Sequence, residues 1–395
     1  MGIEFNNEQI YALYDIENWY HRSSRQLFEL SGPAGSGKTT LIRYAIERLG
    51  LKLDEVLFVA YMGKAASQMA RNGLPAQTIH SAIYDYEETY ARDENGRIII
   101  KANGKPKKVP GFVLKDKIGK KIKLVVVDEG STVETKIAQD LLSFGVPTIV
   151  LGDLNQLPPV FGKPFFLTEP DVILTQVMRQ AEDNPIVWLS QQVLADKQLQ
   201  VGAYGRSSVI HRTSISDFHF KNHDIVITGT NRLRYNINNY MREEIKGIRQ
   251  LDYPHIGEKV ICRKNNWSQK IGDNIYLTNG TTGFVDHIYK SSFNGKTMKM
   301  DFRPDFVKKS FKHIEFDYKH MYAIPGVEIS ESENKYGYLY DKIEYAYAIT
   351  THSSQGSQYP SVLYMHEEFS SDKEFLKKLL YTGITRAREY TTVVL

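Results

Sequence analysis

Short, uninterrupted apolar runs are the most regular feature of the first part of the chain. They occupy residues 56–60, 124–127 and 148–151. Runs of this length without polar alternation are typical of parallel strands that are buried on both faces. Each run ends in polar or glycine-rich sequence, which is where α/β proteins bind ligands. The pattern predicts an α/β fold with a parallel sheet over about the first 150 residues.

A further strand-like run, residues 26–30, leads directly into a glycine-rich stretch. Residues 40–49 follow that stretch with helical periodicity, and Gly50 ends the predicted helix. The glycine-rich stretch between them, residues 32–39, fits the pattern G-x-x-x-x-G-K-[ST]. A strand, this loop and a helix in that order form the usual setting of a nucleoside triphosphate site.

The chemistry of phosphate binding explains the residue types in this loop. Gly35 and Gly37 carry no side chain, so backbone N–H groups can curl around phosphate oxygens. The helix that begins near Lys38 directs its positive end at the same oxygens. Lys38 is expected to reach the β- and γ-phosphates, and the Thr39 hydroxyl to hold Mg²⁺. The loop therefore predicts ATP and Mg²⁺ as ligands.

A second alternating block begins near residue 170. Residues 224–228, 345–350 and 362–365 have the pattern of strands, and residues 230–245 that of a helix. The block predicts a second α/β domain in the C-terminal half of the chain.

Two segments interrupt the alternation of strands and helices. Residues 84–112 contain an apolar run, 97–101, between turn signals, which predicts an inserted hairpin. Residues 255–342 hold short β-rich runs separated by glycine and asparagine turns, which predicts a small inserted β-barrel.

Composition narrows the class of protein only slightly. With 395 residues, two or more domains are expected. The single cysteine, Cys262, excludes an internal disulfide and a multi-cysteine zinc site. No apolar run approaches the roughly 18 residues that span a bilayer, and no signal peptide is visible. These features favour the cytoplasm and no membrane association.

Positive charge is concentrated in one part of the chain. The formal net charge is only +4, but nine lysines and one acid occur between residues 101 and 123. This run is either a solvated loop or a surface that faces phosphates.

Polar residues that follow apolar runs supply candidates for hydrolysis. Asp128 can orient Mg²⁺, and Glu129 can act as the base for the attacking water. Gln156 can donate to the γ-phosphate and accept from the water. Arg386 and Arg179 are candidates for arginine fingers, although each could instead be a structural ion-pair partner.

Taken together and in order, these motifs resemble those of the superfamily 1 helicases, in the RecD/Dda-like branch with 5′→3′ polarity. The stretches that carry the resemblance are 5–9, 32–39, 60–66, 78–81, 128–131, 152–160, the surroundings of Arg179, 347–356 and 381–388. They cover nearly the whole chain. Its compact length and inserted barrel are most similar to the small phage member of this branch.

The resemblance implies roles for individual residues. Gln9 would read adenine, and the residues that would bind nucleotide are Gly32, Gly35, Ser36, Gly37, Lys38, Thr39, Thr40 and Gly356. Thr39 and Asp128 would hold the metal. The residues that would act in hydrolysis are Lys38, Glu129, Gln156, Arg179 and Arg386. The residues that would line the nucleic-acid track are Lys64, Thr78, His80, Thr351 and His352.

The resemblance also implies an architecture of two RecA-like P-loop domains. The first would cover residues 1–168 with a hairpin, or pin, at 84–112, and the second residues 169–254 and 343–395. The barrel at 255–342 would be inserted in the second. The implied function is an ATP-dependent DNA helicase in replication, recombination or repair, acting as a monomer on single-stranded and forked duplex DNA. A single-strand-binding protein or a replisome component is a further candidate partner.

Some positions depart from the family pattern. Tyr61 and Met62 stand where Pro-Thr is usual, Ser353 where lysine is usual, and Gly130 where alanine is usual. Two alternative functions remain open from the sequence. One is an RNA helicase of the same superfamily, and the other is a nucleotide-dependent binding switch that does not unwind.

Overall fold

The structure is a computed structural model. It describes residues 5–71, 73–91, 93, 96–100, 104, 106, 108–158, 164–177, 184–249, 253–272, 275–289, 297–305, 307–327 and 340–395. The chain forms two compact units. The first unit comprises Met1–Ile79, Gly119–Arg249 and Tyr347–Leu395, and the second comprises His80–Ile118 and Gln250–Ala346.

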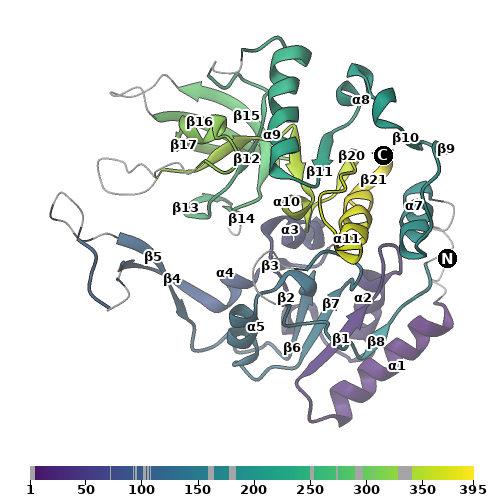
Figure 1. Cartoon of the computed structure of the whole chain (residues 1–395). Coiled ribbons are helices and arrows are strands. Elements are labelled where there is room, and N and C mark those ends of the chain that lie inside the picture. Colours follow the sequence, from purple (N-terminus) through teal and green to yellow (C-terminus); the bar gives the residue numbers. More distant parts are fainter. Residues whose placement is uncertain are drawn as a thin grey trace. The chain divides into compact units, whose positions relative to one another are not determined.

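The first sheet of the first unit has six parallel strands in the order β3-β2-β6-β7-β1-β8 (Figure 1). Its strands are β1 (Leu27–Ser31), β2 (Val56–Ala60), β3 (Ala76–Thr78), β6 (Leu124–Asp128), β7 (Thr148–Gly152) and β8 (Val172–Ile173). This confirms the α/β fold with a parallel sheet. The pairing of β8 with β1 carries the sheet to Ile173, beyond the domain boundary predicted at 168.

Helices cover this sheet because alternate strand residues present apolar side chains to each face. Phe28, Phe58 and Val126 belong to one buried cluster together with residues of α1 (Asn7–Arg22) and α2 (Lys38–Arg48). The intervening strand residues are buried as well. The remaining helices that follow its strands are α3 (Gly63–Arg71), α4 (Ile79–Ile83) and α5 (Thr135–Leu142).

The second sheet of the first unit has the order β19-β11-β20-β21-β10-β9. Its strands are β9 (Gly202–Tyr204), β10 (Ser207–Ile210), β11 (Ile225–Thr228), β19 (Ala348–Thr350), β20 (Tyr359–Met365) and β21 (Ala387–Val394). All neighbours are parallel except β9 and β10. The associated helices are α7 (Pro185–Leu194), α8 (Asp217–Lys221), α9 (Asn231–Tyr240), α10 (Thr351–Ser354) and α11 (Lys373–Ile384), and a π-helical turn, η4 (Met241–Ile245), continues α9.

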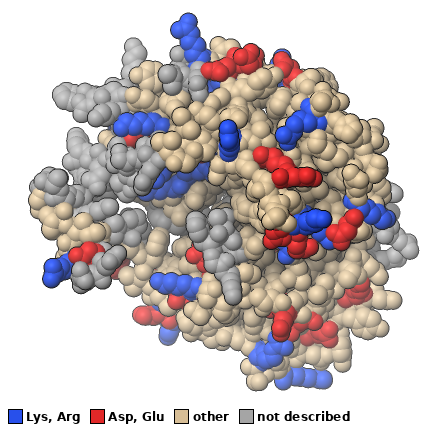
Figure 2. Space-filling model, viewed as in Figure 1, with Lys and Arg blue, Asp and Glu red and all other residues tan. Residues whose placement is uncertain are grey.

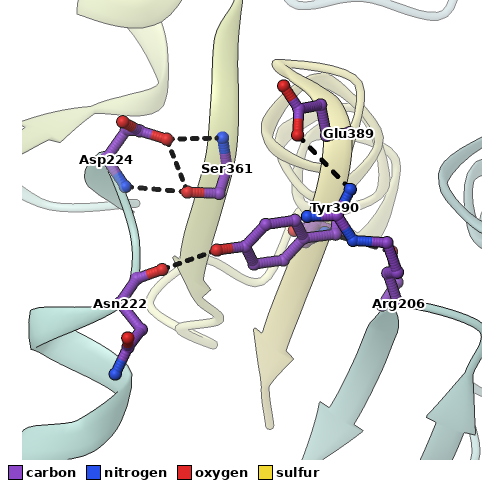
Figure 3. Close-up of polar contacts among 8 residues, drawn as sticks. Arg206, Asn222, Asp224, Ser361, Glu389 and Tyr390 are labelled. Atoms are coloured by element: carbon purple, nitrogen blue, oxygen red, sulfur yellow. Dashed lines mark hydrogen bonds and ion pairs between the residues drawn. The ribbon is translucent and has the colours of Figure 1, made fainter.

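Polar side chains join the strands of the second sheet near their starts (Figure 3). The Asp224 carboxylate accepts from the Ser361 N–H at 2.9 Å and from its hydroxyl at 2.6 Å. The Ser361 hydroxyl in turn accepts from the Asp224 N–H at 2.9 Å. Nearby, the Tyr390 hydroxyl donates to the Asn222 carbonyl at 2.6 Å, and Arg206 lies over the Tyr390 ring. These contacts fix the register of β11 against β20.

Replacing Ser361 with alanine should destabilise the first unit. The change leaves the Asp224 N–H without its acceptor and removes one donor from the Asp224 carboxylate. We expect a loss of roughly 1–3 kcal/mol in the free energy of unfolding, measured by denaturant titration. The exposed Ser143, whose hydroxyl also hydrogen-bonds locally, is the matched control, and Ser143→Ala should change little. Equal stability of the two variants would contradict the role of the Ser361 contact.

The second unit contains a two-stranded ladder. Strand β4 (Tyr84–Tyr90) pairs antiparallel with β5 (Lys108–Leu114), from Tyr84 opposite Leu114 to Tyr90 opposite Lys108. The apolar run that suggested a hairpin lies between these strands and not in them. Within it, Ile100 makes an isolated bridge to Pro106.

An antiparallel sheet in the order β17-β16-β15-β12-β18 forms the rest of the second unit, with a separate pair, β13 and β14. Its elements are β12 (Lys259–Cys262), β13 (Asn266–Ile271), β14 (Ile275–Leu277), β15 (Thr282–Tyr289), β16 (Thr297–Pro304), β17 (Phe311–Asp317) and β18 (Ile343–Tyr345). An isolated bridge joins Phe316, in the first strand of this order, β17, to Asp341, two residues before the start of β18 at the other end. The sheet therefore has a backbone connection between its two edges.

The only cysteine lies inside this sheet. Cys262 is fully buried at the end of β12, and its thiol donates to the Lys264 carbonyl at 2.9 Å. Burial raises the pKa of the Cys262 thiol well above its ordinary value. The thiolate is the reactive form of cysteine, so this thiol is protected from reagents in water.

Several lysines of the predicted basic run are engaged within the fold. Lys115 donates to the Ser81 carbonyl at 2.8 Å, and Lys123 pairs with Glu55 at 2.6 Å. Lys101, Lys105 and Lys107 lie outside the described residues. Figure 2 shows basic and acidic side chains interspersed on the face that it draws. Lys115 and Lys123 therefore have structural partners.

In the described part of the chain, no helix combines the length and apolarity needed to span a membrane.

Candidate nucleotide-binding site

The glycine-rich loop connects β1 to α2, as its sequence predicts. Gly35 and Gly37 have φ values of 83° and 81°, which favour glycine, and Gly37 caps the helix. The Lys38 ammonium donates to the carbonyls of Gly32 at 2.5 Å and Pro33 at 3.1 Å. The lysine is thus held over the loop, and the helix N-terminus that begins beside it can stabilise an anion.

Helix α1 supports the loop from outside through Gln9. The Gln9 amide nitrogen donates to the Ser36 carbonyl at 2.9 Å, and its oxygen accepts from the Asn6 N–H at 3.1 Å. Asn6 returns this contact by capping α1 at the Gln9 N–H. The glutamine predicted to read adenine therefore lies against the phosphate loop and is 1% exposed.

Two acidic residues, Asp128 and Glu129, stand at the end of β6, and Asp128 lies near enough to Lys38 for the two charges to interact. Burial, with a smaller contribution from Glu129, raises the pKa of Asp128 to about 6, and the Lys38 charge partly offsets this rise. Glu129 has a left-handed backbone, with φ 54° and ψ 41°, which is rare for a residue with a side chain. Non-glycine residues in this region cluster at functional sites, because surrounding structure must hold them there.

The packing at Gly130 explains why glycine replaces the usual alanine. A Cβ atom at this position would lie 2.2 Å from Val150 Cγ1 and 3.3 Å from the Leu151 carbonyl oxygen. Atoms cannot approach this closely, so an alanine would push β6 and β7 apart or displace the Asp128–Glu129 turn.

Gly130→Ala should therefore destabilise the protein by about 1–3 kcal/mol through overpacking. Val150→Ala removes the atom in the way, so the double variant should lose less stability than the sum of the single variants. Denaturant unfolding of all four proteins measures the coupling. Strict additivity would show that Val150 does not oppose a side chain at this position.

Gln156 occupies a tight turn after β7. The carboxylate of Asp153 accepts from the Asn155 N–H at 3.0 Å, and the Asp153 carbonyl accepts from the Gln156 N–H at 3.2 Å. Gln156 is 7% exposed, and its side-chain oxygen is buried without a hydrogen-bond donor among the described residues. A buried acceptor of this kind is suited to a ligand or a water.

Residues of the second sheet meet this turn. The Leu157 N–H donates to the Thr382 hydroxyl at 3.0 Å, and its carbonyl accepts from the Gln355 amide at 2.7 Å. Gly356 has φ 65°, and a Cβ there would lie 3.2 Å from Met62 Cβ. The two sheets therefore approach each other where the motifs of both are gathered.

Arg386 lies two residues beyond the end of α11. It is 3% exposed, and its guanidinium donates to the Thr382 carbonyl at 3.0 Å, the Thr385 hydroxyl at 3.2 Å and the Ser357 carbonyl at 3.4 Å. These partners all belong to the second sheet and its connections. Arg179, the other predicted finger, lies outside the described residues.

The residues predicted to line a nucleic-acid track lie in different environments. Thr351 is fully buried and donates to the Thr228 carbonyl at 3.1 Å. The His352 ring stacks on Phe375 with centroids 6.1 Å apart, and burial lowers the pKa of His352. The remaining three are Thr78, which ends β3, His80, whose ring lies against Tyr84 and Phe112 in the second unit, and Lys64, whose backbone is in α3 and whose side chain is not described.

Sequence reasoning assigned no role to Tyr381, Asp153 or Gln355, although all three lie in recognised motifs. Asp153 holds the Gln156 turn, and Tyr381 and Gln355 contact the first sheet from the second. The sequence shows Tyr381 at the start of the 381–388 stretch, but the spacing of the motifs does not reveal that its partner is Asp153.

The fold and this site define a class of protein. The phosphate-binding loop and the Gln156 turn of one parallel sheet are contacted by Tyr381, Thr382 and Gln355, which come from the connections of a second, mostly parallel sheet. This is the arrangement of nucleoside triphosphatases with two RecA-like sheets.

Comparisons with known proteins agree with this class. Residues 5–214 match the AAA domain family, and residues 345–394 match the UvrD-like helicase C-terminal domain. The chain therefore belongs to the AAA-domain family. Together with the match to the UvrD-like helicase C-terminal domain and the similarity to RecD2 and Dda, this identifies it as a superfamily 1 helicase of the RecD/Dda-like branch.

Individual relatives are distant. The chain is 25% identical to the ATP-dependent RecD2 DNA helicase of Deinococcus radiodurans over 93% of this chain and 46% of the relative. It is 25% identical to the ATP-dependent DNA helicase Dda of Enterobacteria phage T4 over 91% and 92% of the two chains. A Pif1 helicase structure from Bacteroides has the same fold, with a TM-score of 0.52, 16% identity and coverage of 99% and 92%. The chain spans less than half of the length of two curated relatives that it matches, 36% and 46%.

Proposed function

We propose that the protein is an ATP-dependent DNA helicase that moves 5′→3′ along single-stranded DNA and separates duplex. The observation that carries this proposal is the meeting of the phosphate loop, the Gln156 turn and α11 within one unit. A simple nucleotide switch needs no second sheet at its site. The relatives named ATP-dependent DNA helicases support the same activity.

Hydrolysis follows from the proposed roles of the site residues. Lys38 and the loop amides bind the β- and γ-phosphates of ATP. Glu129 accepts a proton from water as the water oxygen attacks the γ-phosphorus, and ADP leaves with the electrons of the broken P–O bond. Gln156 orients the water and the γ-phosphate. Arg386 stabilises the charge on the transferring group once its guanidinium turns from its present partners within the protein.

The donor set at the loop fits Mg²⁺. The Thr39 hydroxyl and the Asp128 carboxylate would hold the ion, because Mg²⁺ prefers oxygen ligands and is usually bound through one or two protein groups, phosphates and water. No cluster of three or more His, Cys, Asp or Glu ligands occurs in the described part of the chain. Bound Mg²⁺ would neutralise charge on the phosphates. The raised pKa of Asp128 fits a buried carboxyl that gains from a nearby cation.

The inserted segments have separate proposed roles. We assign the β4–β5 ladder and its connection as the pin that meets the duplex. The antiparallel sheet of the second unit, with its edges joined at Phe316 and Asp341, is assigned as the inserted β-barrel. A single strand held by both RecA-like domains would advance as the cleft closes on ATP and reopens after hydrolysis.

ATPase assays test the proposal most directly. Turnover is measured alone, with single-stranded DNA and with single-stranded RNA of the same sequence. Strong stimulation by DNA supports a DNA helicase, and stimulation by RNA alone would favour the RNA helicase alternative. No stimulation by either would favour a nucleotide-dependent switch.

Forked substrates test the direction. A duplex with only a 5′ tail should be unwound, and one with only a 3′ tail should not. The reverse result would overturn the assignment to the 5′→3′ branch.

A further inference from the structure

One tyrosine hydroxyl contacts two nucleotide-site elements at once. Tyr381 is fully buried on α11, and its hydroxyl donates to Asp153 Oδ2 at 2.6 Å. The same oxygen accepts from the Ala34 N–H, in the phosphate loop, at 3.3 Å. A single atom from the second sheet therefore touches both the phosphate loop and the turn after β7.

Asp153 connects the Tyr381 hydroxyl to Gln156, because its carboxylate and its carbonyl both hold the turn that contains Gln156. The other oxygen of the carboxylate accepts from the Asn155 N–H, and the Asp153 carbonyl accepts from the Gln156 N–H. Asp153 is 1% exposed, so water does not replace a lost partner easily. The direction of the Gln156 side chain depends on this turn.

The neighbouring residue extends the connection toward Arg386. The Thr382 hydroxyl accepts from the Leu157 N–H, directly after Gln156. The Thr382 carbonyl accepts from the Arg386 guanidinium. Adjacent residues of α11 thus hold the Gln156 turn on one side and the predicted arginine finger on the other.

From this arrangement we propose that Tyr381 is a positioning residue that couples the phosphate loop to Gln156 and Arg386. The inference rests on the proposed ATPase function. A shift of the loop at Ala34 changes the hydrogen bond that Tyr381 accepts, and the hydroxyl transmits this change to Asp153 and to α11. The partners of its hydroxyl are protein groups, the Ala34 N–H and the Asp153 carboxylate, so we expect it to act on turnover and not on nucleotide affinity.

The test is Tyr381→Phe, which keeps the buried ring and removes only the bridging oxygen. We expect kcat with saturating single-stranded DNA to fall about tenfold, while KM for ATP stays within about twofold because Lys38 and the loop glycines are intact. A tenfold loss corresponds to about 1.4 kcal/mol, at the lower end of the value of a hydrogen bond to a charged group. The rise in thermal midpoint caused by Mg²⁺ and ATPγS should match that of the unaltered protein.

Asp153→Asn supplies a second, independent variant. If the effect passes through the Tyr381–Asp153 hydrogen bond, the double variant should be no slower than the slower single variant. Tyr240→Phe is the matched control, because it removes a tyrosine–aspartate hydrogen bond, to Asp217, between α9 and α8. Neither helix carries a proposed nucleotide-site residue, so the ATP turnover of the Tyr240→Phe variant should be unchanged.

The outcomes separate the two proposals. Absence of DNA stimulation in the unaltered protein overturns the proposed helicase function, and the unstimulated kcat of Tyr381→Phe then decides on Tyr381. An active protein in which Tyr381→Phe keeps its kcat, or raises KM alone, overturns the positioning role. A fully additive double variant does so too.

Discussion

Glu129→Gln should bind ATP normally and hydrolyse it at least ~10²-fold more slowly. The amide keeps the size and the left-handed backbone of the residue, but it cannot accept the proton of the attacking water. Steady-state ATPase with saturating single-stranded DNA measures the loss, and a fluorescent ATP analogue measures binding.

The neighbouring Glu134 provides the control for this change. It belongs to the same unit, and its carboxylate accepts from the Tyr61 hydroxyl at 3.0 Å. Glu134→Gln should leave turnover within about twofold, as expected for an exposed residue outside the site. Loss of ATP binding in Glu129→Gln would instead show that Glu129 is a structural residue.

Shortening the pin should abolish unwinding and spare the motor. Tyr90 and Lys108 are paired at the end of the β4–β5 ladder, so an Asn-Gly turn can join them in place of residues 91–107. DNA-stimulated ATPase should remain near normal, while unwinding of a 5′-tailed fork collapses. Separation of each base pair costs roughly 1.4 kcal/mol of stacking, and a rigid wedge at the fork helps to supply it when the motor pushes the duplex against the wedge.

A second variant separates the shape of the pin from its apolar tip. Ile98, Ile99 and Ile100 are 39%, 38% and 56% exposed. Changing all three to serine keeps the length and should cost little stability, because exposed side chains contribute little. Reduced unwinding in this variant would assign the wedge to the isoleucines. Parental unwinding in the shortened variant would move the wedge elsewhere, with the β-barrel as the next candidate.

The elements that could be predicted from sequence are those whose signals are local. The run at 56–60 coincides with β2, and the phosphate loop has the predicted glycine conformations. A buried parallel strand is a continuous apolar run, and the loop needs glycine at fixed positions. Both signals lie within a few residues, so no knowledge of distant contacts is required.

The strand predicted at 345–350 is confirmed only over residues 348–350, which form β19, because distant partners decide the pairing of this run. The Ala346 N–H donates to the Lys259 carbonyl in one sheet, and the Tyr347 carbonyl accepts from the Val226 N–H in another. The chain therefore leaves β18 and enters β19 within an apolar run that has no turn signal. The ladder of β4 and β5 lies where a hairpin was predicted, at 84–112, but its paired residues flank the apolar run 97–101 that suggested the hairpin, because the pairing again depends on residues distant in the sequence.

The site was predictable in its residue types and not in its connections. Lys38 and Asp128 could be placed near one another because strand ends of one parallel sheet share an edge. Tyr381 and Ala34 are separated by 347 positions, and nothing in the sequence pairs them.

Because Cys262 is buried, the protein is well suited to site-specific labelling with fluorescent dyes. The only native thiol is buried in the antiparallel sheet, and burial keeps it protonated. Maleimide dyes should therefore not react with it. Cysteines introduced at exposed positions, such as Asp54 in the first unit and Lys309 in the second, would then carry a donor and an acceptor without removal of the native Cys262. Single-molecule energy transfer between them would measure the distance between the two labelled positions with and without ATP.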